Sequence, residues 1–220
     1  MRTIRVTGKG QIRVRPDMTR ITMTLTGLYK EYGETLRHSS ADTEVLKDVL
    51  AEFGFERSDL KTLSFNVDTE YESYRDRNND YKQKFVGYRF NHILKVEFES
   101  DNDRLGKILF ALANCKAKPE FRISYTVKDP EATKNLLLGK AVTDAKEKAV
   151  VLTQAGGVTL KDIQSIDYSW GEIDSEYRPM RDDVLMECCD APLAAKSYNL
   201  DIEPDDIDVS DTVTVVWEIG

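Results

Sequence analysis

The sequence predicts an α+β fold in which a mainly antiparallel sheet carries three helices packed on one face. Several stretches alternate apolar and polar residues, which is typical of half-buried strands, and three others repeat apolar residues every three to four positions, which is typical of amphipathic helices. The connections are mostly short and suit hairpins, which favours antiparallel pairing. The predicted order is ββαββαβαβ, a loop, and a final strand. With no break in composition, residues 1–220 are predicted to form a single domain.

The first two predicted strands cover residues 4–14 and 21–25. Apolar residues and glycines occupy the even positions of the first stretch, and apolar residues occupy the odd positions of the second. Pro16 and Asp17 lie between the two stretches and are typical of a turn. We therefore expect a β-hairpin with one buried face.

Three segments show helical periodicity, and each has a recognisable start or end. The first follows Gly33 and ends at Gly54, a typical C-terminal cap. The second starts at Asp101, a favourable N-cap residue. The third starts at Asp129, has a proline at the next position, and ends at Gly156. One face of this third helix is rich in alanine, which predicts close approach to another backbone.

A long antiparallel hairpin is predicted between the first and second helices. Residues 63–71 and 88–98 both alternate in hydropathy, and the polar segment 76–80 connects them. The remaining strands are expected at 121–127, 166–170 and 213–219.

Negative charge is concentrated in one segment of the chain. The protein has 31 basic and 39 acidic residues, a net charge of −8, and the segment 171–211 holds thirteen of the acidic residues but only three of the basic ones. We predict an acidic insertion or loop there, with cation binding or a basic partner as the alternative. The rest of the chain lacks the clustered basic surface that nucleic-acid binding requires, so we expect no nucleic-acid partner.

The three cysteines do not form a disulfide framework. Their number is odd, Cys188 and Cys189 are adjacent, and Cys115 stands far from both. The C-x-x-C spacing of a structural zinc site is absent. Two interpretations of Cys188 and Cys189 remain open, namely ordinary reduced thiols of a cytoplasmic protein or a redox-sensitive pair.

No motif predicts a catalytic, cofactor-binding or metal site. Gly8 and Gly10 begin a phosphate-loop pattern, but its third glycine is absent and no helix follows, so close packing or a bulge explains them better. The segment 76–80 starts like a calcium loop but lacks the later glycine and glutamate. His38 falls on a helix, and His92 is interpreted as a half-buried histidine with satisfied hydrogen bonds. We therefore expect no cofactor.

Aromatic side chains cluster along the predicted long hairpin. They are Tyr71, Tyr74, Tyr81, Phe85 and Tyr88, and they flank a charged tip. Tyrosine and arginine are enriched in protein–protein contacts, so these five residues are candidates for such a contact. Ordinary cross-strand aromatic pairing is the alternative.

Several short motifs, taken in order along the chain, point to one family. They are the residues 6–10 (VTGKG) with Pro16 and Asp17, the segment 87–89, the start of the third helix at 129–130, and the closing segment 204–215. In order and spacing these motifs resemble the SIMPL-domain family, also called the domain-of-unknown-function 541 group, over nearly the whole chain. The chain departs from the family pattern at Thr69, Lys161 and Asp205, where proline, glycine and glycine are expected.

The resemblance implies an α+β fold, a periplasmic or surface location in most bacterial members, and a link to oxidative-stress defence. From an immunogenic periplasmic member it also implies assembly into a large channel-like ring, and it supplies no catalytic residues. The sequence as it stands starts without an apolar leader, so we expect a cytoplasmic location, or a periplasmic or surface one if a leader has been removed. No stretch approaches the roughly 18 apolar residues of a membrane span, so no transmembrane segment is expected.

The leading hypothesis for function is a non-enzymatic SIMPL-domain protein that self-associates and acts as a scaffold or a stress-associated module. Its partners would be further copies of the chain or another protein. The first alternative is an enzyme or small-molecule-binding protein with a pocket that the sequence does not reveal. The second is a thiol-based redox sensor that uses Cys188 and Cys189.

Overall fold

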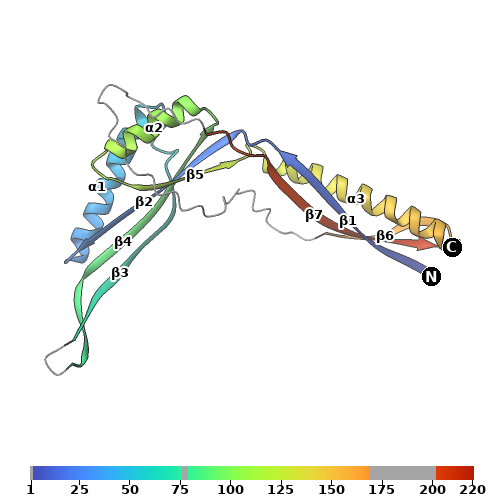
Figure 1. Ribbon diagram of the computed structural model, residues 1–220, viewed down its shortest axis with the longest axis horizontal. Coiled ribbons are helices and arrows are strands. Elements are labelled where there is room, and N and C mark those ends of the chain that lie inside the picture. Colours follow the sequence, from blue (N-terminus) through green and yellow to red (C-terminus); the bar gives the residue numbers. More distant parts are fainter. Residues whose placement is uncertain (1, 76–78, 169–201) are drawn as a thin grey trace. The chain divides into compact units, whose positions relative to one another are not determined.

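The computed structural model describes residues 2–75, 79–168 and 202–220 (Figure 1). The predicted α+β class and order of elements are confirmed. No helix in these ranges combines the length and the apolar content needed to cross a membrane. The helices are α1 (Tyr32–Ala51), α2 (Asn102–Asn114) and α3 (Pro130–Ala155), and the strands are β1 (Arg2–Val14), β2 (Met18–Tyr29), β3 (Lys61–Arg75), β4 (Tyr81–Glu99), β5 (Glu120–Thr126), β6 (Leu160–Tyr168) and β7 (Ile207–Ile219).

The contacts divide the chain into two compact units, each with a sheet of its own. The first unit holds β1, α3, β6 and β7. The second holds β2, α1, β3, β4, α2 and most of β5. The single domain that the sequence predicts over 1–220 stays a prediction, since a division by contacts does not show whether the units fold separately.

In the first unit, α3 lies against an antiparallel sheet with the order β1-β7-β6. The helix approaches β1 very closely, as its alanine-rich face predicts. A Cβ atom on Gly8 would lie only 2.0 Å from the carbonyl oxygen of Ala141, and one on Gly10 only 2.2 Å from that of Leu137. Glycine is therefore required at both positions for the helix backbone to reach the strand. The core of this contact consists of Val6, Ala141, Ala145, Ala149, Val213, Val215 and Trp217.

In the second unit, α1 and α2 pack on a sheet with the order β3-β4-β2-β5. Its core is built from large side chains, because the inward-facing residues of β2 and β4 meet the apolar faces of both helices. The fully buried residues include Ile21, Met23, Leu46, Phe90, Leu94, Val96, Ile108 and Leu112.

Strand pairing differs from the prediction at the start of the chain. The hairpin expected from residues 4–14 and 21–25 is wrong, because β1 pairs with β7 and β2 pairs with β4, in different sheets. The segment that connects β1 and β2 is instead hydrogen-bonded to the end of β5 and the residues after it. The Asp17 backbone N–H donates to the Thr126 carbonyl at 3.2 Å, and the Lys128 N–H donates to Asp17 Oδ1 at 2.8 Å. The helices are accordingly shared between two sheets rather than gathered on one.

Most local signals of the other elements hold, but α1 ends at Ala51 with Glu52 as its C-cap rather than at the predicted Gly54. Asp101 and Asp129 accept hydrogen bonds from the backbone N–H groups of the first helical turn at 3.0 and 2.8 Å, as N-caps do. β3 and β4 form the predicted long hairpin. Most of the acidic segment 171–211 lies outside the described residues, but its last five residues belong to β7.

Candidate functional site

The β3–β4 hairpin presents the most exposed strand of the second unit. β3 lies at the outer edge of its sheet, while α1 contacts β2 and β4. Nearly every residue of β3 is therefore exposed on both faces of the sheet. Figure 1 shows the two strands continuing past the start of α1 towards the tip of the hairpin. Among the residues that the structure describes, no strand pairs with the outer side of β3, and an edge strand of this length offers a long row of backbone groups to another chain.

A chain of aromatic rings runs along this hairpin. Tyr71 contacts Phe85 with the ring centroids 5.8 Å apart, and Phe85 contacts Tyr88 at 5.2 Å. Tyr88 in turn contacts Tyr32 at 5.4 Å. The ring planes are inclined by 69° to 88°, the edge-to-face geometry that aromatic pairs favour. Three of the five predicted contact residues are thus brought together in one row.

The two remaining predicted residues lie nearer the tip of the hairpin. The Arg75 guanidinium lies over the Tyr81 ring at 4.5 Å from its centroid, and it also donates to the Tyr81 hydroxyl at 2.5 Å. Tyr74 lies opposite Lys82 across the strand pair. The tip therefore combines exposed aromatic rings with cationic groups, which is the composition of many protein-contact sites.

The opposite side of the hairpin is ordered by charge pairs. Arg89 Nε donates to Glu70 at 3.1 Å, and this hydrogen bond raises the pKa of Arg89. Further along the strands, Glu72 lies opposite Lys84. These exposed pairs contribute little stability but favour one register of the two strands.

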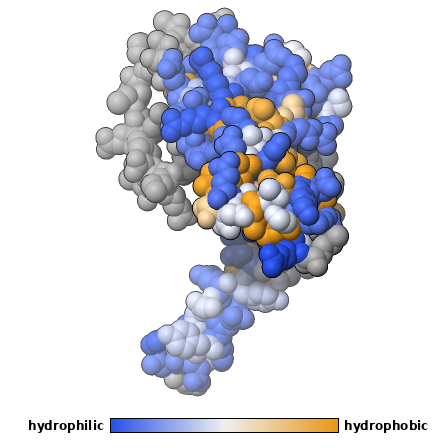
Figure 2. Space-filling model, turned by 90° about the vertical axis from the view of Figure 1, so that its right-hand side faces the viewer, coloured by the Kyte–Doolittle hydropathy of each residue, from blue (hydrophilic) through white to orange (hydrophobic). Residues whose placement is uncertain are grey.

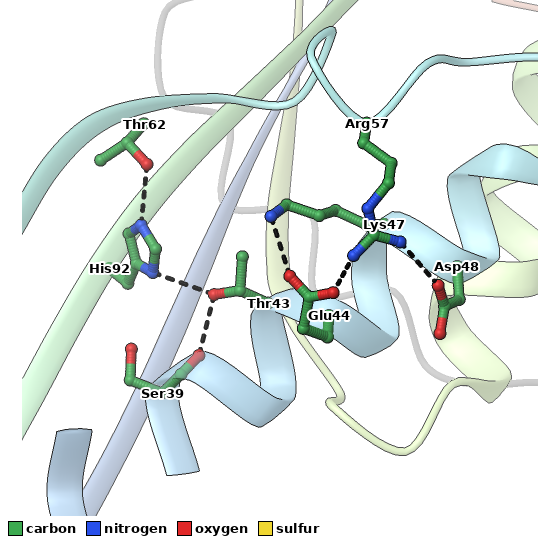
Figure 3. A network of polar contacts seen from close by, with 8 residues as sticks. All are labelled: Ser39, Thr43, Glu44, Lys47, Asp48, Arg57, Thr62 and His92. Carbon is green, nitrogen blue, oxygen red and sulfur yellow. Dashed lines mark hydrogen bonds and ion pairs between the residues drawn. The ribbon is translucent and has the colours of Figure 1, made fainter. Parts of the chain in front are cut away.

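At the base of the hairpin, His92 links β3 and β4 to α1 (Figure 3). The Thr43 hydroxyl donates its hydrogen to the Ser39 carbonyl at 2.8 Å, so at 3.2 Å it accepts from His92 Nδ1–H. His92 Nε2 then accepts from the Thr62 hydroxyl at 3.0 Å. Both ring nitrogens are satisfied in the neutral form, which confirms the hydrogen-bonded histidine predicted from the sequence, although His92 is buried rather than half-buried.

Burial sets the protonation of this histidine. It lowers the pKa of His92, and the nearby positive charge of Lys47 lowers it further. The Phe65 ring packs edge-on against the imidazole with the centroids 5.0 Å apart. Next to it, ion pairs of Arg57 with Glu44 and Asp48 tie the loop before β3 to α1, and Glu44 also pairs with Lys47 within the helix (Figure 3). The network therefore fixes the base of the hairpin, with its groups directed at one another.

The other predicted site residues give no assembled centre. Cys188 and Cys189 lie outside the described residues, and Cys115 is buried. In the described ranges, no three His, Cys, Asp or Glu side chains are grouped to hold a metal ion. A concavity of about 490 Å³ is lined by exposed side chains of α3, from Asn135 to Glu147. All of its described lining comes from one helix, so it does not support the hypothesis of an enzyme or a small-molecule-binding protein.

Sequence reasoning missed three residues of the hairpin surface. Tyr32 extends the row of rings, although it was not assigned to the aromatic cluster. Leu63 and Phe65 are half-exposed, although alternation alone suggests that they face the core. A period-two pattern identifies the apolar face of a strand, but it does not tell whether a helix covers that face.

Comparison with known families places the whole chain. A family model named SIMPL and described as "Protein of unknown function (DUF541)" matches residues 4–217. This chain belongs to the SIMPL family. The match covers both units and the entire β3–β4 hairpin. The description of the SIMPL family assigns no biochemical role.

Two relatives of this SIMPL protein are both named 26 kDa periplasmic immunogenic protein. The one from Brucella melitensis biotype 1 is 29% identical over 164 residues, and the one from Brucella abortus strain S19 is 28% identical over 164 residues. Each match covers 74% of this chain but 65% of the relative, so the matched part spans less than two thirds of the relatives' length.

Proposed function

We propose that this SIMPL protein is non-enzymatic and self-associates, with the β3–β4 hairpin as a contact between copies. It then serves as a scaffold or stress-associated module. The observation that supports this proposal is the row of half-exposed aromatic rings on a strand pair whose outer edge is uncovered. The ion pairs and the His92 network support it further, because a hairpin held in one conformation loses little entropy on binding.

The chemistry of the surface suits a protein partner. Tyrosine and arginine dominate the energetically important positions of protein interfaces, and Tyr71, Tyr81 and Arg75 are displayed together here. A partner strand on the edge of β3 would satisfy its outward backbone groups while the rings are buried. A periplasmic location, taken from the names of the relatives, belongs to this proposal.

The decisive experiment measures the solution mass of the full chain by light scattering behind size exclusion. We expect a discrete oligomer for the wild type and a smaller species for the double variant Tyr71→Ser/Phe85→Ser. Each substitution removes a ring at the centre of the proposed contact and costs about 2 kcal/mol of association, or about thirtyfold in affinity.

Phe121→Ser is the matched control for that experiment. Phe121 lies on β5 of the same unit and is 43% exposed, against 42% for Phe85. The control should leave the mass of the oligomer unchanged. A wild type that elutes as a 25.1 kDa monomer would refute the self-association proposal.

Thiol sensing remains a separate hypothesis. The variant Cys188→Ser/Cys189→Ser tests it under peroxide, with the solution mass as the measurement. A response identical to that of the wild type would remove this alternative.

A further inference from the structure

The C-terminal turns of α3 are apolar on more than the side that faces the sheet. Ala149 and Thr153 are buried against β1, β7 and β6, but the three residues between them, Val150, Val151 and Leu152, are all exposed. Val151 is 65% exposed. Three consecutive exposed apolar residues on a helix are unfavourable in water unless another surface covers them.

β6 carries matching apolar residues that α3 does not cover. Ile163 pairs with Trp217 and Ile166 with Val215, and both partners are buried beneath α3. Ile163 and Ile166 therefore point to the same side of the sheet as the helix, yet both remain half-exposed. The reason lies at the other edge: Gly8 and Gly10 draw α3 onto β1 and away from β6.

We call the exposed apolar residues of these two elements the α3–β6 face: Val150, Val151, Ile163 and Ile166. Only a short connection separates the end of α3 from the start of β6, so the two parts are neighbours. Figure 2 looks onto this end of the unit and shows hydrophobic side chains gathered there among charged ones.

The two edge strands of this sheet, β1 and β6, differ in what contacts them. At β1, the Asp144 side chain accepts the backbone N–H of Lys9 at 2.7 Å, which occupies a group that a further strand would need. Lys148 and this N–H hold the pKa of Asp144 below its usual value, so the capping carboxylate is charged. β6 forms the opposite edge, next to the α3–β6 face. A further strand is therefore hindered from pairing with the edge of β1, whereas the exposed edge strand β6 lies beside exposed apolar side chains.

We propose that β6 pairs antiparallel with β6 of a second copy, and that the α3–β6 faces of both copies are buried in this two-fold contact. An apolar face is complementary to a copy of itself, as a two-fold interface requires. One pair of charges favours antiparallel pairing, because Lys161 lies near the start of β6 and Asp167 near its end, and Asp162 then lies opposite the uncharged Ile166. Antiparallel strands bring these unlike charges together, whereas parallel strands would align like charges.

This inference rests on the proposed self-association and adds a contact distinct from the hairpin. A two-fold contact joins two copies and buries the same surface on both, so it cannot bind a third copy. A second contact at the hairpin would link those pairs to one another. Each contact can therefore be removed while the other remains, and the two proposals fail separately.

The test uses the full chain with Tyr71→Ser/Phe85→Ser, in which the hairpin contact is removed. We expect this protein to be a dimer of about 50 kDa, twice the 25.1 kDa chain, by sedimentation velocity. Adding Val151→Glu should weaken dimerisation about a hundredfold. Leu136→Glu is the matched control, because Leu136 is 57% exposed on the same helix, about 22 Å away along its axis. It should leave the dimer intact.

Charge exchange tests the antiparallel arrangement. In the same background, Lys161→Glu and Asp167→Lys should each weaken the dimer about tenfold, since each pair occurs twice in a two-fold contact, and the double variant should restore it. Lys161 also lies 3.5 Å from Glu218, so thermal unfolding of each variant checks that the fold is retained.

The inference is overturned if the background protein is monomeric, if Val151→Glu behaves like Leu136→Glu, or if the exchanged pair restores nothing. In any of these cases the hairpin proposal still stands, provided that the wild-type oligomer is lost in Tyr71→Ser/Phe85→Ser.

Discussion

In the two units of this SIMPL protein, the helices pack on their sheets through residues of opposite size. In the first, α3 touches β1 through glycine and alanine, so backbone lies almost directly on backbone. In the second, α1 and α2 meet their sheet through large side chains such as Phe90 and Leu112. The contact between α3 and β1 therefore has no room for an added atom, whereas the core of the second unit depends on its large side chains.

In each unit, one edge strand is exposed along almost its whole length. The close contact of α3 with β1 leaves β6 exposed, and the position of α1 over β2 and β4 leaves β3 exposed. The two proposed contacts between copies lie at these strands. A small number of helices over a wider sheet thus leaves an exposed edge strand in each unit, which is where we propose that copies associate.

The largest expected effect is the loss of a core side chain in the second unit. Phe90 is fully buried, so Phe90→Ala should lower the free energy of unfolding by about 3–5 kcal/mol. Chemical denaturation followed by circular dichroism measures this change. A loss below about 1 kcal/mol would mean that the second unit does not depend on its large side chains.

The same variant tests whether the two units fold together. Trp217 is buried in the first unit, and with Trp170 replaced by Phe its fluorescence reports on that unit alone. We expect Phe90→Ala to shift the Trp217 signal and the circular dichroism signal equally, as a single domain requires. An unshifted Trp217 signal would show two independently folding domains.

The next effect concerns an added methyl group in the first unit. Gly8→Ala places Cβ against the Ala141 carbonyl and should cost about 1–3 kcal/mol, because backbone must move to admit it. Gly139→Ala is the matched control, since a Cβ there meets nothing within 4 Å, and it should stabilise α3 by about 0.5–1 kcal/mol. Equal effects of both changes on the denaturation midpoint would contradict the close contact.

The helix caps should not distinguish the units. Asp101→Ala in the second unit and Asp129→Ala in the first each remove one capping hydrogen bond, and each should cost about 1 kcal/mol. The reason is that a cap is a local interaction, independent of how the helix packs. A much larger loss at either position, measured by thermal unfolding, would reveal a tertiary role for that carboxylate.

The smallest expected effect is a dependence on pH that originates at His92. Its folded pKa lies below the ordinary value of 6.5, so the unfolded chain takes up the proton first as the pH falls. Stability should therefore decrease as the pH falls from about 6.5 towards the folded pKa, and it should be unaffected above that window. His92→Gln should flatten this part of the stability profile, and an unchanged slope would assign the effect to other groups.

The candidate site was only partly visible in the sequence. The clustering of Tyr71, Phe85 and Tyr88 followed from their spacing on a predicted hairpin, and the row of ring contacts agrees with it. Tyr32 and Phe65 join this surface through tertiary contacts that no local pattern encodes. On α3, Leu152 is exposed, and helical periodicity by itself does not reveal how wide a face the sheet covers.

The sequence by itself determined the elements, their order, the N-caps Asp101 and Asp129 and the β3–β4 hairpin, since each depends on residues close together in the chain. The tertiary structure alone decided that β1 pairs with β7, that the strands divide into two sheets, and that the edge strands β3 and β6 are exposed along almost their whole length. The physical reason is that alternation reports which side chains are buried, whereas the choice of a partner strand depends on non-local packing. At β1 that packing is the fit of Gly8 and Gly10 to the backbone of α3.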